Sequence, residues 1–296
     1  MEINAHNLGI LTTAVNTRFK TAFNATAKDK YNEIALTVPM STGVINYPFL
    51  EQLGGMREWI DDRKVKKIAA NKLVVSARKF EETVAIERDA IEDDTYGMYM
   101  PIIDNLGVQA ANLRGDLIEE VLTNASSAKW VDGASFFGTS RKYGKETINN
   151  YTTSALSKST LKTAYDAMRN YKGHGGTNLK VRPRYLVIGS ALRWTAKALV
   201  ENPQEEVNGA ALPNETYNLV QILETDADLG NKWFLIGETG IGKAIGYFDR
   251  IAPSMVRKDK ETDDNVFYQD EYVYGTRARA ESAWLFPHLA YFGNVS

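Results

Sequence analysis

A single long helix is the strongest constraint that this sequence places on its fold. Apolar residues recur at intervals of four, four, three, four and four positions, which is the spacing of one helical face. This stripe consists of Ile102, Leu106, Ala110, Leu113, Leu117 and Val121. Pro101 suits the first turn of a helix, and Asn124 and Ser126 mark its end. We therefore predict one continuous helix of about 20 residues or more.

A second amphipathic helix is predicted at the N-terminus. Its apolar residues lie three or four positions apart, at Leu8, Leu11, Val15, Phe19 and Phe23. A helix at a chain end has no partner close in sequence, so the stripe must pack against a distant segment or against a neighbouring molecule. The residues alone leave both possibilities open.

Charges are segregated between residues 57 and 94. From Arg63 to Lys79 the seven charged residues are all basic: Arg63, Lys64, Lys66, Lys67, Lys72, Arg78 and Lys79. The next stretch carries one base, Arg88, among seven acids: Glu81, Glu82, Glu87, Asp89, Glu92, Asp93 and Asp94. Strand-like runs at 65–68, 73–77 and 83–87 predict a hairpin with one basic and one acidic limb. The limbs could neutralise each other across the pair, contact opposite charges on a neighbouring copy, or form a solvated face.

The rest of the sequence mixes helices and strands irregularly. Helices are predicted from about Ser159, its cap, to Tyr171, and from Ser190 to about Val200. Residues 33–50 are expected to be extended, and residues 132–151 and 202–216 to be loops. Further strands are predicted at 184–188, 217–223, 233–236, 244–248, 266–268, 272–279 and 288–292. This order indicates the α+β class.

One motif suggests nucleotide chemistry. Residues Gly237 to Lys243 fit the GxxxxGK spacing and follow an apolar strand. The next position is Ala244, so the hydroxyl that would hold magnesium is absent. The residues after it have the pattern of a strand, whereas a phosphate loop needs the N-terminus of a helix there. We interpret the motif as a β-turn between two strands.

Other patterns also argue against catalysis and cofactors. The absence of cysteine excludes disulfides, thiolate metal sites and cysteine nucleophiles. His6, His174 and His288 have no metal-binding spacing, and no GxSxG motif is present. The 35 basic and 37 acidic residues give a net charge of −2, which is not the signature of a nucleic-acid binder. We predict no catalytic, cofactor-binding or metal-binding residues.

The sequence shows neither a signal peptide nor a membrane-spanning segment. The first ten residues lack the basic and apolar regions of a signal peptide. No window approaches the roughly 18 consecutive apolar residues of a membrane span. We therefore expect a protein that is made in the cytoplasm and does not enter a membrane.

Several short segments, spread over more than 200 residues, occur in an order that points to a family. They are Arg57–Arg63, Phe80–Val84 with Ile86, Arg88–Asp89 and Ile91–Asp94, then Met100–Pro101, Asp132–Phe137, Arg184–Gly189, Trp233–Glu238, Gly246–Tyr247, Arg250, Phe267, Gln269–Asp270, Arg277 and Arg279. In this order they resemble the major capsid proteins with the HK97 fold, and among these the major head subunits of phage Mu and Mu-like prophages. No one segment is specific, but their order is.

The resemblance implies an α+β, HK97-like capsid fold in five parts. These are an N-terminal arm (1–46), an extended loop or E-loop with flanking strands (47–95), the spine helix of a peripheral or P-domain (96–130), an axial or A-domain (131–245), and P-domain strands with a C-terminal strand returning to the A-domain (246–296). The tip of the E-loop would lie near residues 71–79.

The resemblance also implies a function. The chain would be a structural subunit, not an enzyme, that assembles into hexamers and pentamers of an icosahedral phage shell around double-stranded DNA. Its partners would be further copies of itself, a separate scaffolding protein, the portal and, nonspecifically, the packaged DNA, with no membrane. We expect the subunit interface to include Leu8, Leu11, Val15, Phe19, Arg63, Lys64, Lys66, Lys67, Lys79, Glu81, Glu82 and Glu87. The alternatives are an encapsulin-like cage of the same fold and, less favoured, an α+β nucleotide-binding enzyme.

Overall fold

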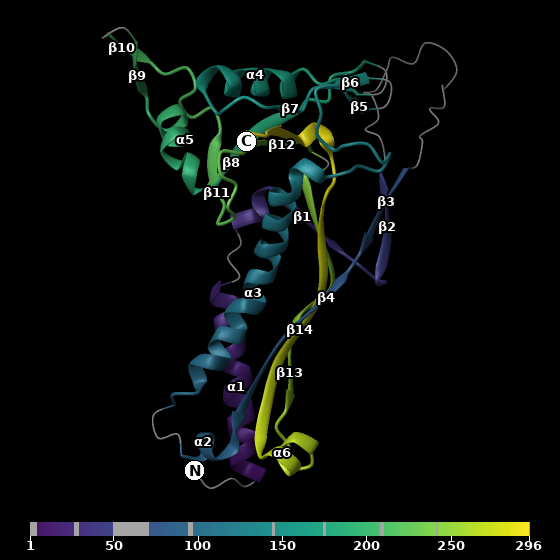
Figure 1. Cartoon of the computed structure of the whole chain (residues 1–296), viewed down its shortest axis with the longest axis vertical. Coiled ribbons are helices and arrows are strands. Elements are labelled where there is room, and N and C mark those ends of the chain that lie inside the picture. The colour runs from purple at the N-terminus through teal and green to yellow at the C-terminus, as the bar shows by residue number, and fades with distance from the viewer. Residues whose placement is uncertain are drawn as a thin grey trace.

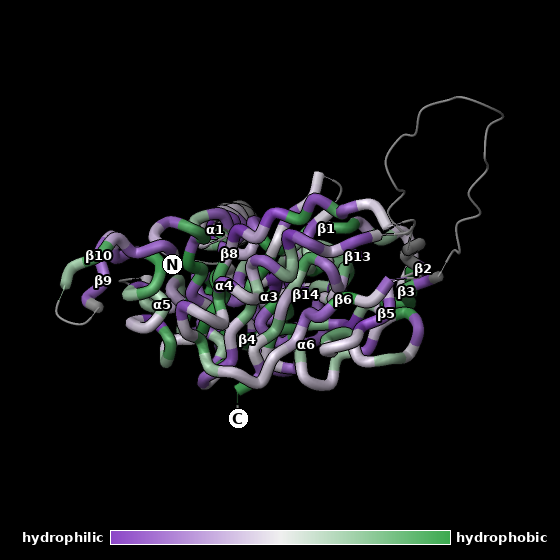
Figure 2. The backbone as a smooth tube through the Cα atoms, turned by 90° about the horizontal axis from the view of Figure 1, so that it is seen from above, coloured by the Kyte–Doolittle hydropathy of each residue, from purple (hydrophilic) through white to green (hydrophobic). Residues whose placement is uncertain are grey.

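The computed structural model describes residues 5–26, 30–49, 71–93, 97–143, 146–173, 176–207, 210–240 and 242–295. Figure 1 shows an elongated molecule with two parts. The narrow body contains helices α1 (Ala5–Thr26) and α3 (Met100–Thr123) beside long strands. The broad body lies at the other end and contains a second sheet with its own helices. Viewed along the long axis, the molecule is shallow compared with its width (Figure 2).

Four strands form the sheet of the narrow body. Their order is β1 (Ala35–Pro39), β13 (Ile245–Lys258), β14 (Glu271–Trp284) and β4 (Arg78–Glu87). Strands β1 and β13 are parallel, and the other two pairs are antiparallel. At 14 residues each, β13 and β14 are long enough to reach from the narrow body into the broad body (Figure 1).

The long helix predicted from the apolar stripe is confirmed as α3. It begins at Met100 with Pro101 in its first turn and is followed by Asn124 at the C-cap. Its buried face is slightly rotated from the predicted stripe, because Ile103, Ile118 and Leu122 are buried whereas Ile102 is exposed. The buried side of α3 faces both the sheet and α1.

Helices α1 and α3 approach each other closely at Gly107. A Cβ atom on this residue would lie 2.7 Å from the carbonyl oxygen of Phe19 and 3.0 Å from the Cβ of Ala22. An ion pair also links the two helices. The guanidinium of Arg18 on α1 donates two hydrogen bonds, of 2.7 and 3.1 Å, to the carboxylate of Asp104 on α3. The predicted N-terminal helix is therefore confirmed, and it packs on its own chain.

The broad body is built on a five-stranded mixed sheet. Its strand order is β11 (Gln221–Glu224), β8 (Arg182–Ile188), β12 (Trp233–Glu238), β15 (Ala290–Gly293) and β7 (Tyr151–Thr152). The helices associated with it are α4 (Lys158–Arg169) and α5 (Arg193–Val200). The cap of α4 is Ser157 and not the predicted Ser159, because Ser157 forms a capping box with Thr160.

The remaining elements are short. They are β2 (Val44–Phe49), β3 (Asn71–Ser76), α2 (Arg88–Glu92), β5 (Arg141–Tyr143), β6 (Glu146–Ile148), β9 (Gln204–Val207), β10 (Ala210–Pro213), α6 (Asp264–Gln269) and four 3-10 turns (Lys30–Glu33, Asn124–Ser127, Ser190–Leu192, Pro287–Leu289). The hairpins β5–β6 and β9–β10 lie in segments predicted to be loops. The predicted strand at 266–268 is wrong, since these residues belong to α6, which Asp270 ends in a left-handed conformation (φ 54°). The predicted strand at 217–223 begins only at Gln221.

An aromatic cluster joins the two bodies. Phe234 of β12 stacks on Phe292 of β15, with ring centroids 4.6 Å apart. Trp284, at the end of β14, contacts Phe137 at 5.0 Å and Phe234 at 5.8 Å. Because β14 also forms the sheet of the narrow body, this cluster fixes that sheet to the broad body.

A polar junction also connects the two bodies. The hydroxyl of Tyr31 donates to the carboxylate of Glu119 on α3 and lies 2.7 Å from the hydroxyl of Thr225, just after β11. Nearby, Lys30 pairs with Asp226 at 2.5 Å, and the Tyr185 hydroxyl donates to Glu33 at 2.8 Å. The 3-10 turn of residues 30–33 therefore holds the broad body against α3.

The buried imidazole of His288 should make the free energy of unfolding of the broad body depend on pH. The imidazole is buried against the rings of Tyr143 and Phe286, and burial lowers its pKa to about 3. An unfolded chain binds this proton below pH 6.5, whereas the folded chain binds it only near pH 3. The free energy of unfolding should therefore fall as the pH drops from 6.5, by up to about 1.4 kcal/mol per pH unit from this group. Thermal unfolding at pH 7.0, 6.0 and 5.0 checks this, and His288→Leu should lose that part of the slope. An unchanged slope in the variant would contradict the assignment.

None of the helices in the described part of the chain is both long enough and apolar enough to cross a bilayer.

Candidate subunit interface

The motif at residues 237–243 begins in the last two residues of β12 and connects that strand to β13, in agreement with the predicted turn between two strands. Strand β12 ends at Glu238, Thr239 pairs with Gly242 in an isolated bridge, and β13 begins at Ile245. The Lys243 ammonium donates to the carbonyl oxygen of Asn32. The motif therefore leads into a strand and not into a helix N-terminus that would stabilise a phosphate.

Among the described residues, no group of three or more His, Asp or Glu side chains is arranged to hold a metal. His288 is enclosed in the broad body. The side chain of His6, and the whole of His174, lie outside the described residues.

The stripe of α1 faces the interior of its own chain. Val15 is 1% exposed and Phe19 is 5% exposed. Both lie in a cluster with residues of α3, β4 and β14, which includes Ile86, Ile103, Leu106 and Tyr272. The prediction that Val15 and Phe19 contact a neighbouring copy is therefore wrong, because α3 and the sheet already cover them. The side chains of Leu8 and Leu11 lie outside the described residues.

The predicted hairpin of basic and acidic limbs is also wrong. Strand β3 pairs with β2, and β4 pairs with β14, so the described residues of the basic run do not pair with the acidic strand as two limbs of one hairpin. Residues 71–79 are not a loop tip either, because Val75 and Ala77 are buried in a small core with Phe248. Arg63, Lys64, Lys66 and Lys67 lie outside the described residues.

Four of the predicted interface residues lie exposed on β4: Lys79, Glu81, Glu82 and Glu87. In the antiparallel register, Lys79 is opposite Arg279 and Glu81 is opposite Arg277. Glu81 accepts a 2.7 Å hydrogen bond from the hydroxyl of Thr83. No ion pair between described residues involves Glu81, Glu82 or Glu87.

Arg78, at the start of the same strand, is fully compensated within the chain. Its guanidinium pairs with Glu281 at 2.7 Å and with Glu120 at 2.6 Å. These carboxylates raise the pKa of Arg78 above its ordinary value. The positive charge of Arg78 is therefore neutralised by carboxylates of the same chain. The acids that follow it on β4, Glu81, Glu82 and Glu87, form no ion pair with a described residue.

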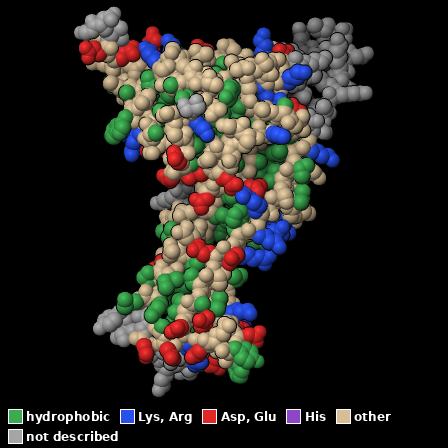
Figure 3. Space-filling view, viewed as in Figure 1, with side chains coloured by type: hydrophobic (Ala, Val, Ile, Leu, Met, Phe, Trp, Pro, Cys, Tyr) green, Lys and Arg blue, Asp and Glu red, His purple; other side chains and the backbone are tan. Residues whose placement is uncertain are grey.

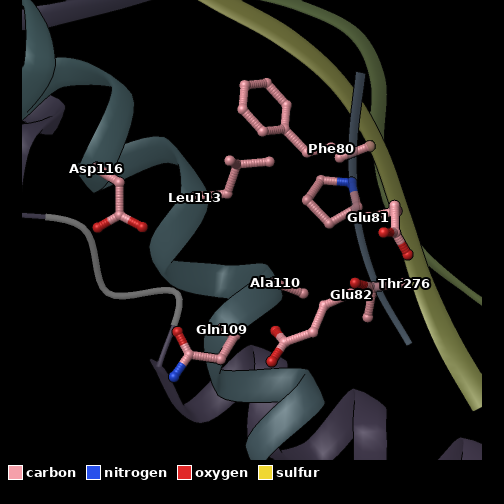
Figure 4. A pocket seen from close by; sticks show the side chains of 10 residues that line it. Phe80, Glu81, Glu82, Gln109, Ala110, Leu113, Asp116 and Thr276 are labelled. Atoms are coloured by element: carbon pink, nitrogen blue, oxygen red, sulfur yellow. The ribbon is translucent and has the colours of Figure 1, made fainter. Parts of the chain in front are cut away.

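A groove of about 180 Å³ lies between β4 and α3 (Figure 4). Its apolar lining is Phe80, Ala110, Leu113, Pro253 and Ala278, and its polar lining is Glu81, Glu82, Gln109, Asp116 and Thr276. The Glu82 side chain points toward α3, whereas that of Glu81 points away from the helix. Partial burial and the neighbouring Glu119 carboxylate raise the pKa of Asp116. Sequence reasoning missed Gln109 and Asp116, which lie outside the apolar stripe of α3.

Large apolar side chains are also exposed elsewhere. Phe267 and Tyr268 on α6, with rings 5.0 Å apart, are 75% and 78% exposed at the end of the narrow body. Acidic side chains surround hydrophobic ones at this end (Figure 3). In the broad body Trp194 is 75% exposed, with Arg193 and Lys197 beside its ring. Sequence reasoning placed Phe267 and Tyr268 in a predicted strand and gave no indication that both would be exposed.

Comparison with known proteins identifies related sequences along nearly the whole chain. The family model described as "Mu-like prophage major head subunit gpT" matches residues 8–158, 148–227 and 224–295. The major capsid protein of Escherichia phage Mu is 24% identical over 264 residues, which cover 89% of this chain and 66% of that protein. The Mu-like prophage FluMu major head subunit of Haemophilus influenzae is 26% identical, covering 90% of this chain and 67% of the relative. The chain thus spans about two thirds of the length of these relatives.

Solved structures share the fold. A chain of the procapsid of bacteriophage JBD30 has a TM-score of 0.60 and 25% identity, with 98% of this chain and 76% of that chain covered. The encapsulin SrpI from Synechococcus elongatus PCC 7942 has a TM-score of 0.53 at 11% identity, covering 92% and 89%, which is a likeness of fold alone. These matches confirm the predicted α+β, HK97-like capsid fold.

Proposed function

Because the chain belongs to the family of Mu-like prophage major head subunits, we propose that it is the structural subunit of a phage head. Copies of it assemble into hexamers and pentamers, which close into an icosahedral shell around double-stranded DNA. The observation that carries this proposal is the family match, which extends from residue 8 to residue 295. The likeness to a phage procapsid chain over 98% of the present chain supports it.

The proposal assigns the five predicted parts to the two bodies. The P-domain comprises the spine helix (96–130) and the strands of 246–296, whose last strand enters the sheet of the broad body. The A-domain (131–245) supplies most of that sheet. Helix α1 of the N-terminal arm (1–46) lies along the spine helix, and the described part of the E-loop segment with its flanking strands (47–95) includes β3, β4 and α2.

The proposed partners follow from a role in a shell. They are further copies of this chain, a separate scaffolding protein, the portal, and DNA held by weak nonspecific contact, since the net charge is only −2. Each contact between copies can be weak, because many act together in a closed shell. Assembly takes place in the host cytoplasm and the product is the virion capsid, with no catalytic step by this chain.

Negative-stain electron microscopy of the chain, expressed with the scaffolding protein of its own phage, tests the proposal. Closed shells or six-fold rings of uniform size are the expected result. Monodisperse monomers at high protein concentration, with scaffold present, would contradict it. Closed shells that form without scaffold and enclose a protein cargo would favour the encapsulin-like alternative.

A further inference from the structure

The groove between β4 and α3 has carboxylates at two different levels. The ion pair of Arg78 on β4 with Glu120 on α3 shows which residues of the two elements lie level with each other. From Arg78 to Glu82 the strand extends about 13 Å, and about nine residues of helix cover the same distance. Later residues of β4 contact earlier residues of α3, so the two elements run in opposite directions. Glu82 is therefore level with about residue 111, and Asp116 lies about 7 Å further along the groove (Figure 4).

Apolar side chains line the groove beside these carboxylates. Phe80 of β4, Leu113 and Ala110 of α3, and Ala278 of β14 contribute to this lining. The volume of about 180 Å³ is small, since pockets for drug-sized ligands measure roughly 300 to 1,000 Å³. The groove therefore suits a small, narrow ligand with polar ends and an apolar middle.

Neither carboxylate is neutralised by a described residue of the chain. Glu82 and Asp116 form no ion pair with any of these residues, and Arg78 already pairs with two other carboxylates. Burial, and after it the neighbouring Glu119 carboxylate, raises the pKa of Asp116, which is the shift of an acid without a cation beside it. The groove therefore presents two negative charges to a cation from outside the chain.

A buried hydroxyl lies beside Glu82. Thr276 of β14 is directly opposite Glu82 in the strand register, so both side chains lie on the face of the sheet toward α3. Thr276 is only 8% exposed, and its hydroxyl forms no hydrogen bond with a described residue. Gln109 lines the same end of the groove, and its amide nitrogen donates to Asn105 at 3.5 Å, which leaves the amide oxygen to accept. An ammonium group at this end can donate to the carboxylate, the hydroxyl and the amide oxygen.

We propose that this groove binds a linear polyamine, such as putrescine or spermidine, in which protonated amines are joined by short alkyl chains. One ammonium contacts Glu82 and Thr276, the alkyl chain lies along Leu113, and a second ammonium contacts Asp116. A lysine side chain of another protein carries only one ammonium and would leave one carboxylate unpaired. A Mg²⁺ ion holds its oxygen ligands at about 2.1 Å, so carboxylates at two levels of an apolar groove are poorly placed to share one. The site belongs to the single subunit and does not depend on the proposed function.

Calorimetric titration of the unassembled subunit with spermidine, at constant ionic strength, tests the site. Saturable binding of one spermidine per chain is expected, and butylamine, which has a single amine, should bind about tenfold more weakly or less, because it pairs with only one carboxylate. Glu82→Gln and Asp116→Asn should each weaken spermidine binding about tenfold for the same reason. Glu81→Gln is the matched control, because the Glu81 side chain points away from α3 (Figure 4) and its loss should leave the affinity unchanged.

A second pair of variants keeps both acids in place. Gln109→Lys puts an ammonium of the chain itself into the groove from an exposed position of α3 and should abolish spermidine binding. Asn112→Lys adds the same charge to an exposed position of α3 outside the groove lining and should leave the binding in place. Equal losses in the two lysine variants, equal losses in Glu81→Gln and Glu82→Gln, or equal affinities for butylamine and spermidine would show only general attraction to surface charge and would overturn the proposal. Absence of saturable binding to the unaltered subunit would overturn it as well.

Discussion

Val15→Asp is expected to unfold the narrow body of the free subunit, and not merely to weaken contacts between subunits. The Val15 side chain is 1% exposed and lies in the cluster that joins α1 to α3 and to the sheet. A carboxylate placed there would lose its hydration with no described cation inside the cluster, at a cost of about 3 kcal/mol or more. Urea unfolding of the unassembled subunit, followed by circular dichroism, should show a lower midpoint or a loss of soluble protein.

Asn24→Asp is the matched control, because Asn24 lies on the exposed side of the same helix. It introduces the same charge into α1 and should leave the unfolding midpoint nearly unchanged. A Val15→Asp subunit with the unfolding curve of the original chain, and a defect only in assembly, would show that α1 leaves its own α3 and packs on a neighbour.

The two long helices were predictable because their signal is local. A 3.6-residue period repeated over more than four turns is hard to produce by chance, and both stripes correspond to helices. The exact buried face was less well determined. Ile102 belongs to the stripe but is exposed, because the position of α1 and of the sheet decides which residues of a broad apolar face are covered.

The predicted hairpin failed because strand partners are chosen by distant segments. The acidic run of β4 pairs with β14, almost 200 residues later, and nothing between residues 63 and 94 encodes that choice. The strand predicted at 266–268 failed for another reason. Three apolar residues are too few for periodicity to separate a strand from one turn of helix, and the acids before them favour a helix start.

For the candidate interface, too, the sequence predicted local properties of residues but not which segments they contact. Exposure of Lys79, Glu81, Glu82 and Glu87 is what a charged strand predicts, and their contact with another copy stays a prediction. Val15 and Phe19 were placed wrongly, since an apolar stripe indicates burial but not the molecule that provides it. Asp116 and Gln109 gave no signal, because a polar residue of a helix does not reveal which strand lies opposite.

Gly293→Ala is expected to destabilise the broad body strongly. Gly293 of β15 is opposite Trp233 of β12 in the sheet, and a Cβ atom there would lie 2.1 to 2.6 Å from three atoms of the indole ring. The ring cannot easily move, because it is fully buried, stacks on Tyr291 at 6.0 Å and donates a 3.2 Å hydrogen bond to the Ser154 carbonyl. Overpacking of this kind costs about 3 kcal/mol or more where the neighbours cannot yield. Differential scanning calorimetry of the unassembled subunit should show the loss as a lower unfolding temperature.

Gly138→Ala separates this effect from the general consequence of replacing a glycine. No atom lies within 4 Å of a Cβ built at Gly138, so this variant should unfold at nearly the original temperature. Trp233→Leu should recover part of the loss when combined with Gly293→Ala, because it removes the overlapping ring while leaving a cavity. Strand β15 lies between β12 and β7 and contributes Phe292 to the aromatic cluster with Phe234 and Trp284, so both bodies should unfold together at the lower temperature. Separate transitions, with the narrow body unfolding at its original temperature, would show that this cluster does not couple them.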